Sequence, residues 1–159
     1  MTGVAQSPVK TPCIGVCSTG IGDTVCRGCK RFSHEVINWN SYTDHQKHLI
    51  DSRLSVFLSQ CVRNKLIVSD RVLLERQLQV QQVAYTPSHD EYCWAYSMIK
   101  AGASQIDAPE NYGFRVLSEY ADMSLVLLRN IIDADFFALS QAHYDRYVLA
   151  PGMFRGTLK

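Results

Sequence analysis

Long hydrophobic runs are missing from this sequence. Its apolar stretches, such as Leu125 to Leu128, are far too short for a membrane helix, which needs about 20 apolar residues. Met1 to Thr11 contain one lysine and lack the apolar core of a secretory signal peptide. We therefore expect no membrane partner and a cytoplasmic location, where thiols stay reduced.

An excess of either charge is also missing. The 16 lysine and arginine residues and 15 aspartate and glutamate residues give a net charge of +1, so the chain has no general attraction for nucleic acid or acidic lipid. The aromatic residues between Tyr92 and Tyr120 have only Lys100 and Arg115 as basic neighbours, whereas base stacking normally comes with a basic groove. We expect these aromatic residues to line a core or pocket, and we expect no nucleic-acid partner.

Sequence patterns of several enzyme classes are absent too. The sequence has no Ser-His-Asp order, no phosphate-binding P-loop and no glycine fingerprint for a dinucleotide. These absences disfavour a hydrolase or a nucleotide-dependent enzyme. We expect a binding protein rather than an enzyme.

Four cysteines near the start of the chain are the most informative feature. Cys13, Cys17, Cys26 and Cys29 have the spacing C-x3-C-x8-C-x2-C, two close pairs separated by a glycine-rich loop. So short a segment is not expected to bury an apolar core of its own. Four thiolates around one metal centre would supply the missing stabilisation. We therefore predict that these four cysteines bind a metal ion or a metal cluster.

The spacing leaves the kind of metal open. Zinc accepts four thiolates, and Cys26-Arg27-Gly28-Cys29 is typical of one arm of a structural zinc site. An iron–sulfur cluster also takes four cysteines and is stabilised by hydrogen bonds from glycine-rich loops. A third interpretation is a redox dithiol at Cys26 and Cys29, which requires a lowered thiol pKa. Two more cysteines so close by favour ligation over the dithiol.

Several other residues are expected to support this site. Gly15 and Gly28, with Gly20 and Gly22, allow the backbone to turn its N–H groups toward sulfur. Trp39 is expected to pack as a lid against the metal-binding segment. Glu35 is expected to form a surface ion pair with Arg31 or Lys30.

The same segment resembles a known family. The matching residues are Pro12–Cys17, Cys26–Arg31, Glu35–Val36 and Trp39. They are similar to a small bacterial family, domain of unknown function 1289, whose members are described as predicted iron–sulfur proteins. The resemblance spans residues 12–54 and ends in the helix that contains Arg53. It implies an iron–sulfur cluster in preference to zinc, but it implies no reaction. Lys30 and Phe32 depart from the family, which more often has glycine and threonine there.

The other cysteines and the nearby histidines fit simpler roles. Cys61 and Cys93 lie on apolar stripes of expected helices, so we predict that both belong to the core. Four cysteines complete a metal site without further ligands. We therefore expect His34, His45 and His48 to lie on the helix surface.

The rest of the pattern is helical. We predict a mainly α fold with a small four-cysteine metal-binding knuckle at the N-terminus, packed on a helical body. The domains are a leader at 1–11, a metal-binding module with its following helix at 12–54, and a helical region at 55–159. The first expected helix is a short one capped by Ser33, and the second is opened by the Thr43–Gln46 capping box. A third is capped by Ser69 or Asp70 and runs through Val83, and a fourth is opened by Ser88 and Glu91 and ends near Gly102. Two more are expected at Ser118–Asn130 and Asp133–Val148.

Together these features predict a cytoplasmic iron–sulfur or metal-binding protein whose helical body binds a protein partner. The alternative is a structural zinc-binding adaptor without catalysis. A weaker alternative is a redox protein that transfers electrons through the cluster.

Overall fold

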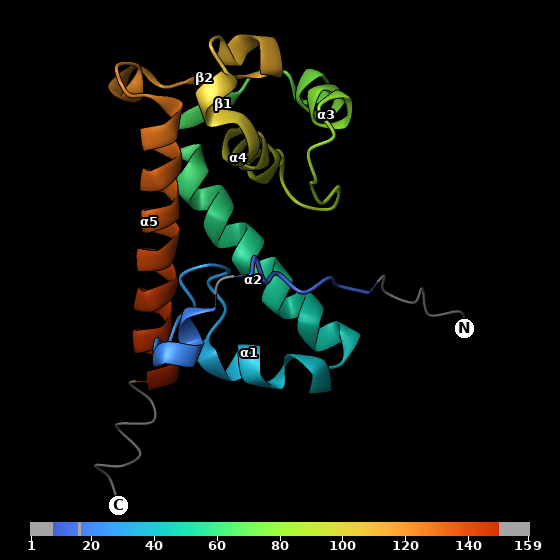
Figure 1. Ribbon diagram of the computed structural model, residues 1–159, viewed down its shortest axis with the longest axis vertical. Helices are drawn as coiled ribbons and strands as arrows, with labels where there is room; N and C mark the ends of the chain where they lie inside the picture. Colours follow the sequence, from blue (N-terminus) through green and yellow to red (C-terminus); the bar gives the residue numbers. More distant parts are fainter. Residues whose placement is uncertain (1–7, 16, 150–159) are drawn as a thin grey trace, which may run out of the picture. The chain divides into compact units, whose positions relative to one another are not determined.

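The chain is mainly α, as the sequence predicts. The computed structural model describes residues 8–15 and 17–149, and within these ranges it has five α-helices and two short strands (Figure 1). None of the helices in the described part is long and apolar enough to cross a membrane. The elements are α1 (Ser33–Asn38), α2 (Asp44–Arg63), β1 (Leu66–Val68), α3 (Arg71–Val80), α4 (Glu91–Gly102), β2 (Phe114–Val116) and α5 (Leu125–Tyr144), the last followed by a π-helical turn (Asp145–Leu149).

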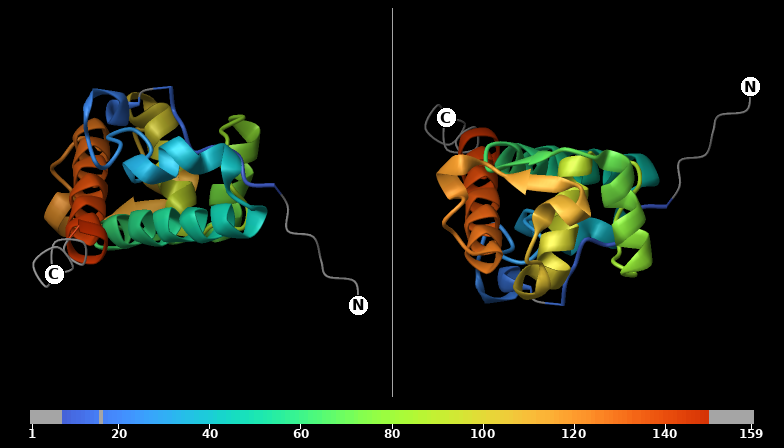
Figure 2. Two further views of the ribbon diagram at one scale, coloured as in Figure 1. Left: turned by 90° about the horizontal axis from the view of Figure 1, so that it is seen from below. Right: turned by 90° about the horizontal axis from the view of Figure 1, so that it is seen from above.

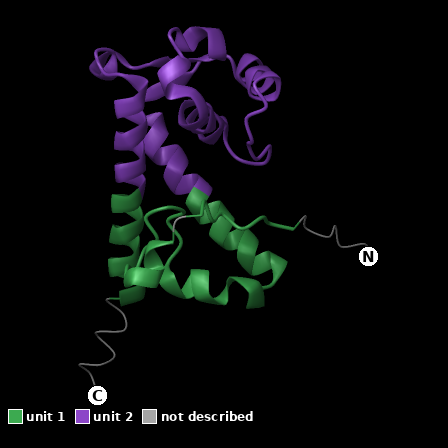
Figure 3. Ribbon diagram, in the orientation of Figure 1, with its two compact units in different colours: residues 1–54, 137–159 green, residues 55–136 purple. Residues whose placement is uncertain are grey.

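The elements form two compact units (Figure 3). Unit 1 comprises Met1–Leu54 and Phe137–Lys159, and unit 2 comprises Ser55–Phe136. The chain passes from one unit to the other inside α2 and again inside α5. The leader, module and helical region expected from the sequence stay predictions, and most of the leader lies outside the described residues.

Unit 1 has an apolar core, contrary to the expectation that the cysteine segment buries none. Val25 and Phe32 are buried and form an isolated antiparallel bridge. The Phe32 ring packs edge-on against Tyr144 of α5, with 5.2 Å between ring centroids, and stacks on His143 at 6.0 Å. The cysteine segment therefore packs against a helix more than 100 residues further along the chain, so its shape does not depend on metal ligation alone.

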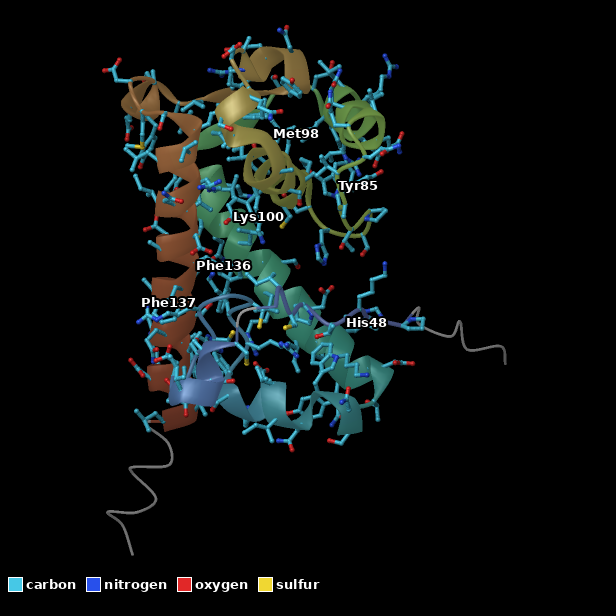
Figure 4. The ribbon with its side chains drawn as sticks, in the orientation of Figure 1. His48, Tyr85, Met98, Lys100, Phe136 and Phe137 are labelled. Carbon is cyan, nitrogen blue, oxygen red and sulfur yellow. The ribbon has the colours of Figure 1, made fainter. Side chains whose placement is uncertain are left out.

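Unit 2 is built around a small antiparallel β-ribbon, whose two arrows can be followed in Figure 2. Leu66 of β1 pairs with Val116 of β2, and Val68 pairs with Phe114. The sequence pattern predicts no strand here, because three residues are too few to show the alternation of a strand. Tyr85, labelled in Figure 4, packs edge-on against the buried Trp94 at 5.4 Å. The fully buried side chains of this unit include Leu66, Leu74, Leu78, Ile99, Phe114, Leu128 and Ile132.

Two predicted helix starts are confirmed in atomic detail. Gln46 Oε1 accepts the Thr43 N–H at 2.9 Å, and the Gln46 N–H donates to Thr43 Oγ1 at 3.2 Å, which is the reciprocal pattern of a capping box. Asp70 caps α3 and accepts the N–H of Leu73 at 3.0 Å. Local sequence signals suffice at both positions because donor and acceptor lie within one helical turn.

Other predicted helix boundaries were wrong. Asp90 rather than Ser88 caps α4, since its carboxylate accepts the Tyr92 N–H at 2.8 Å. Phe32 rather than Ser33 is the N-cap of α1. The helix from Asp70 ends at Val80, before Val83. In each case the observed cap or helix end lies only one to three residues from the predicted one.

The largest correction concerns α5, which is one continuous helix where two were expected. Asn130 and Asp133 suggested an end and a new start, but both have helical backbone. A buried stripe with a spacing of four residues runs through this point, and its members are Leu128, Ile132, Phe136 and Ser140. Burial of this stripe outweighs the weak helix preference of asparagine and aspartate.

Candidate metal centre

Cys26 and Cys29 lie in a tight turn that is closed by the backbone. The Cys26 N–H donates to the Arg31 carbonyl at 2.9 Å, and the Lys30 N–H donates to the Cys26 carbonyl at 2.8 Å. The bridge between Val25 and Phe32 flanks this turn. We call residues 26–31 the cysteine turn. Its two thiols are buried and close together.

The sulfur of Cys26 is surrounded by hydrogen-bond donors. Burial alone would raise the pKa of this thiol, but backbone N–H groups of Cys29, Ser18 and Gly28 and a side-chain hydrogen bond with Cys29 together lower the pKa to about 7. N–H groups that donate to sulfur stabilise the thiolate, which is the form that binds a metal. The cysteine turn therefore has the donor chemistry of half a thiolate metal site.

Cys29 has a different environment. Burial raises the pKa of its thiol, and the hydrogen bond and positive charge of Arg31 oppose this rise. Arg31 Nε donates to Cys29 Sγ at 3.2 Å. The Arg31 guanidinium lies over the ring of Trp39, 4.9 Å from its centroid. Trp39, expected as a lid, thus reaches the cysteine turn through Arg31.

The other pair of predicted ligands is exposed. Cys13 Sγ accepts the Gly15 N–H at 3.4 Å, and Cys17 Sγ shares a hydrogen bond with Thr19 Oγ1 at 3.0 Å. Among residues 8–15 and 17–149, no three His, Cys, Asp or Glu side chains are close enough together to hold a metal ion. The six cysteines all lie in these ranges and are free thiols. The four-cysteine ligand set stays a prediction, of which the structure assembles one pair.

Gly15 and Gly28 turn their N–H groups toward the sulfur atoms of Cys13 and Cys26, as expected from the sequence. Gly15 and Gly22 have φ angles of 90° and 103°, in the region that glycine enters most easily. In the cysteine turn, however, the left-handed residue is Lys30, with φ of 66°. Its Nζ donates to the carbonyls of Arg27 at 2.6 Å and Gly28 at 3.2 Å. A left-handed backbone is the conformation that glycine enters most easily, so a lysine at this position is unusual.

Glu35 differs most from its predicted role. It is buried, and its carboxylate accepts two hydrogen bonds from the Arg53 guanidinium at 2.6 Å each. Its Oε1 also accepts the Phe32 N–H at 2.8 Å, and the Arg53 guanidinium lies 4.0 Å from the centroid of the Phe32 ring. The expected surface pair with Arg31 or Lys30 was wrong. Arg53 was missed because no local pattern connects residues that lie 18 positions apart.

His143 is a second residue that sequence reasoning missed. Burial lowers its pKa below the ordinary value of 6.5, the charge of Arg53 lowers it further, and Glu35 opposes the shift. As the pH falls below about 6.5, the unfolded chain therefore takes up a proton before the folded chain does, and stability decreases. The loss ends once the pH is below the lowered pKa of the folded protein.

The lowered pKa of His143 predicts how the stability of the protein depends on pH. We expect the unfolding free energy of wild type, measured in urea between pH 8 and pH 5, to fall more steeply than that of His143→Phe, which keeps an aromatic ring without the titration. Identical pH profiles for the two proteins would contradict the assignment.

The fold and the cysteine turn define a mainly helical protein with a cysteine-rich N-terminal segment. Residues 11–56 match the family model described as protein of unknown function (DUF1289). This match confirms the resemblance stated from the sequence, over the cysteine segment, α1 and part of α2. No curated protein matches the chain. No solved structure matches it either.

Proposed function

We propose that this protein binds an iron–sulfur cluster through Cys13, Cys17, Cys26 and Cys29, in the cytoplasm, and that its helices form the body that binds a protein partner. Such a cluster supplies one-electron redox chemistry or a structural cross-link when it is bound. The proposal treats the protein as a carrier or sensor of iron or electrons rather than as an enzyme.

The main observation in support of this proposal is that several backbone N–H groups donate hydrogen bonds to the Cys26 sulfur. Hydrogen bonds to sulfur stabilise thiolates and tune clusters, and here three backbone groups donate to one buried sulfur. The cysteine turn fits a thiolate-bound metal for this reason. In the proposed holo protein, exposed Cys13 and Cys17 complete the ligand set.

Zinc is the alternative occupant of the same four thiolates. A zinc centre has the same ligands and would make the protein a structural adaptor without redox chemistry. Protein purified without oxygen distinguishes the two. Visible absorption with iron and acid-labile sulfide supports the cluster, whereas colourless protein with one zinc ion per chain overturns it.

The ligand assignment makes a sharper prediction. We expect Cys26→Ser to abolish metal binding, because a structural site loses its metal when a thiolate is removed. Cys61→Ser is the matched control, since Cys61 is also buried but lies on α2 in unit 2. It should keep the metal and lose only stability. Equal loss of metal from both variants, measured by elemental analysis, would contradict the assignment.

A redox dithiol at Cys26 and Cys29 is the second candidate. The hydrogen bond between the two thiols and the lowered pKa of Cys26 favour it. Cys13→Ser separates the two functions, because a dithiol does not need Cys13 and a four-thiolate centre does. Retained thiol–disulfide exchange with an unchanged metal content in Cys13→Ser would favour the dithiol.

A further inference from the structure

Arg31 is a buried cation without an acidic partner. The residue is only 3% exposed, and in the described part of the chain it forms no ion pair with a carboxylate. Lys65, another buried cation, pairs with Asp135 at 2.6 Å, and the part-buried Arg53 pairs with Glu35 at the same distance. Lys30 is buried too, and its Nζ donates to the carbonyls of Arg27 and Gly28. Arg31 differs from these three cations because its Nε donates to a cysteine sulfur.

The contacts of Arg31 point to the missing negative charge. Its Nε donates to Cys29 Sγ at 3.2 Å, and its guanidinium lies on the Trp39 ring. A buried charge is costly unless a charge of opposite sign compensates it. A neutral thiol does not compensate it. Four thiolates around a divalent metal do, because they leave an excess of negative charge on the centre.

We propose that Arg31 is the counter-charge of the thiolate centre, a positioning residue that Trp39 holds against the sulfur of Cys29. This inference rests on the proposed function and deepens it, because it assigns the centre a net negative charge and names the residue that balances it. Zinc and an iron–sulfur cluster share this property, so the inference applies to both.

If Arg31 is the counter-charge, Arg31→Met should have different consequences for the metal-free and the metal-bound protein. Without metal, Arg31 is a buried charge that lacks an anion, so Arg31→Met should not lower the urea midpoint of unfolding. With metal, the same change removes the balancing charge and weakens binding. A purely structural role for Arg31 would instead lower the urea midpoint of the metal-free protein.

Titration of the reduced full-length chain with Co²⁺ tests the counter-charge role of Arg31. Binding is followed through the thiolate-to-cobalt absorption bands. We expect Arg31→Met to raise the dissociation constant about 10- to 100-fold, as for other partners of metal ligands. Arg31→Lys keeps the charge and should stay within a few-fold of wild type. Arg27→Met is the matched control, because Arg27 lies in the same turn but its side chain is 67% exposed and contacts Asp23 and Phe137.

The outcomes separate the two proposals. If wild type binds Co²⁺ and Arg31→Met binds it as tightly as Arg27→Met does, the counter-charge role is overturned and the proposed function stands. The role is also overturned if Arg31→Lys loses as much affinity as Arg31→Met, or if Arg31→Met destabilises the metal-free protein. If wild type binds neither Co²⁺ nor iron, the proposed function fails together with this inference.

Discussion

Arg53→Ala should lower the free energy of unfolding by about 3–5 kcal/mol, the cost of removing one partner from a buried ion pair. The exposed fractions of the Arg53 and Glu35 side chains are only 17% and 6%, so water screens the pair little. The change leaves the Glu35 carboxylate buried, with the Phe32 N–H as a remaining donor. It also removes the cation from the face of the Phe32 ring. Urea unfolding at neutral pH measures the loss.

Two further variants make this prediction specific. Asp23→Ala breaks the exposed Asp23–Arg27 pair of the same unit and should cost less than about 1 kcal/mol. The double variant Glu35→Leu with Arg53→Met should recover part of the stability, because it removes both charges together. A cost for Arg53→Ala no greater than that for Asp23→Ala would contradict the assigned role.

Gly113→Ala should destabilise unit 2 by about 3 kcal/mol, the sum of a left-handed backbone strain and a steric clash. Gly113 precedes β2 with φ of 88°, and its carbonyl accepts the N–H groups of Ser69 and Asp70. An added Cβ would lie 2.8 Å from the backbone nitrogen of Leu74 and still closer to the Asp70 carbonyl oxygen. Both obstacles are backbone atoms that cannot rotate away.

Gly22→Ala is the natural control for this change. Gly22 has φ of 103° and no atom within 4 Å of an added Cβ, so it reports the backbone strain alone, about 1–2 kcal/mol. The difference between the two variants in urea unfolding isolates the clash at Gly113. Equal losses of unfolding free energy in the two variants would show that the close approach of Gly113 to α3 does not make the substitution more costly.

Much of the helical framework was predictable because its signals are local. The Thr43–Gln46 capping box, the Asp70 cap and the end of α4 at Gly102 each depend on residues within one turn of helix. The burial of Cys61 and Cys93 also followed from the apolar stripes on their helices. The β-ribbon was not predictable, because its two three-residue strands lie almost 50 residues apart and have no distinctive pattern.

The cysteine segment shows most clearly which features local sequence predicts and which it does not. The four-cysteine spacing, the mainly α class and the family resemblance follow from the sequence, since all three depend on residue identity and short-range order. The three-dimensional fold is needed to see that Glu35 pairs with Arg53, that Phe32 packs on His143 and Tyr144, and that Arg31 is buried against Cys29 without a carboxylate. These pairings depend on which helix faces are brought together and on which charges lose their contact with water, and neither is set by the neighbours of a residue along the chain.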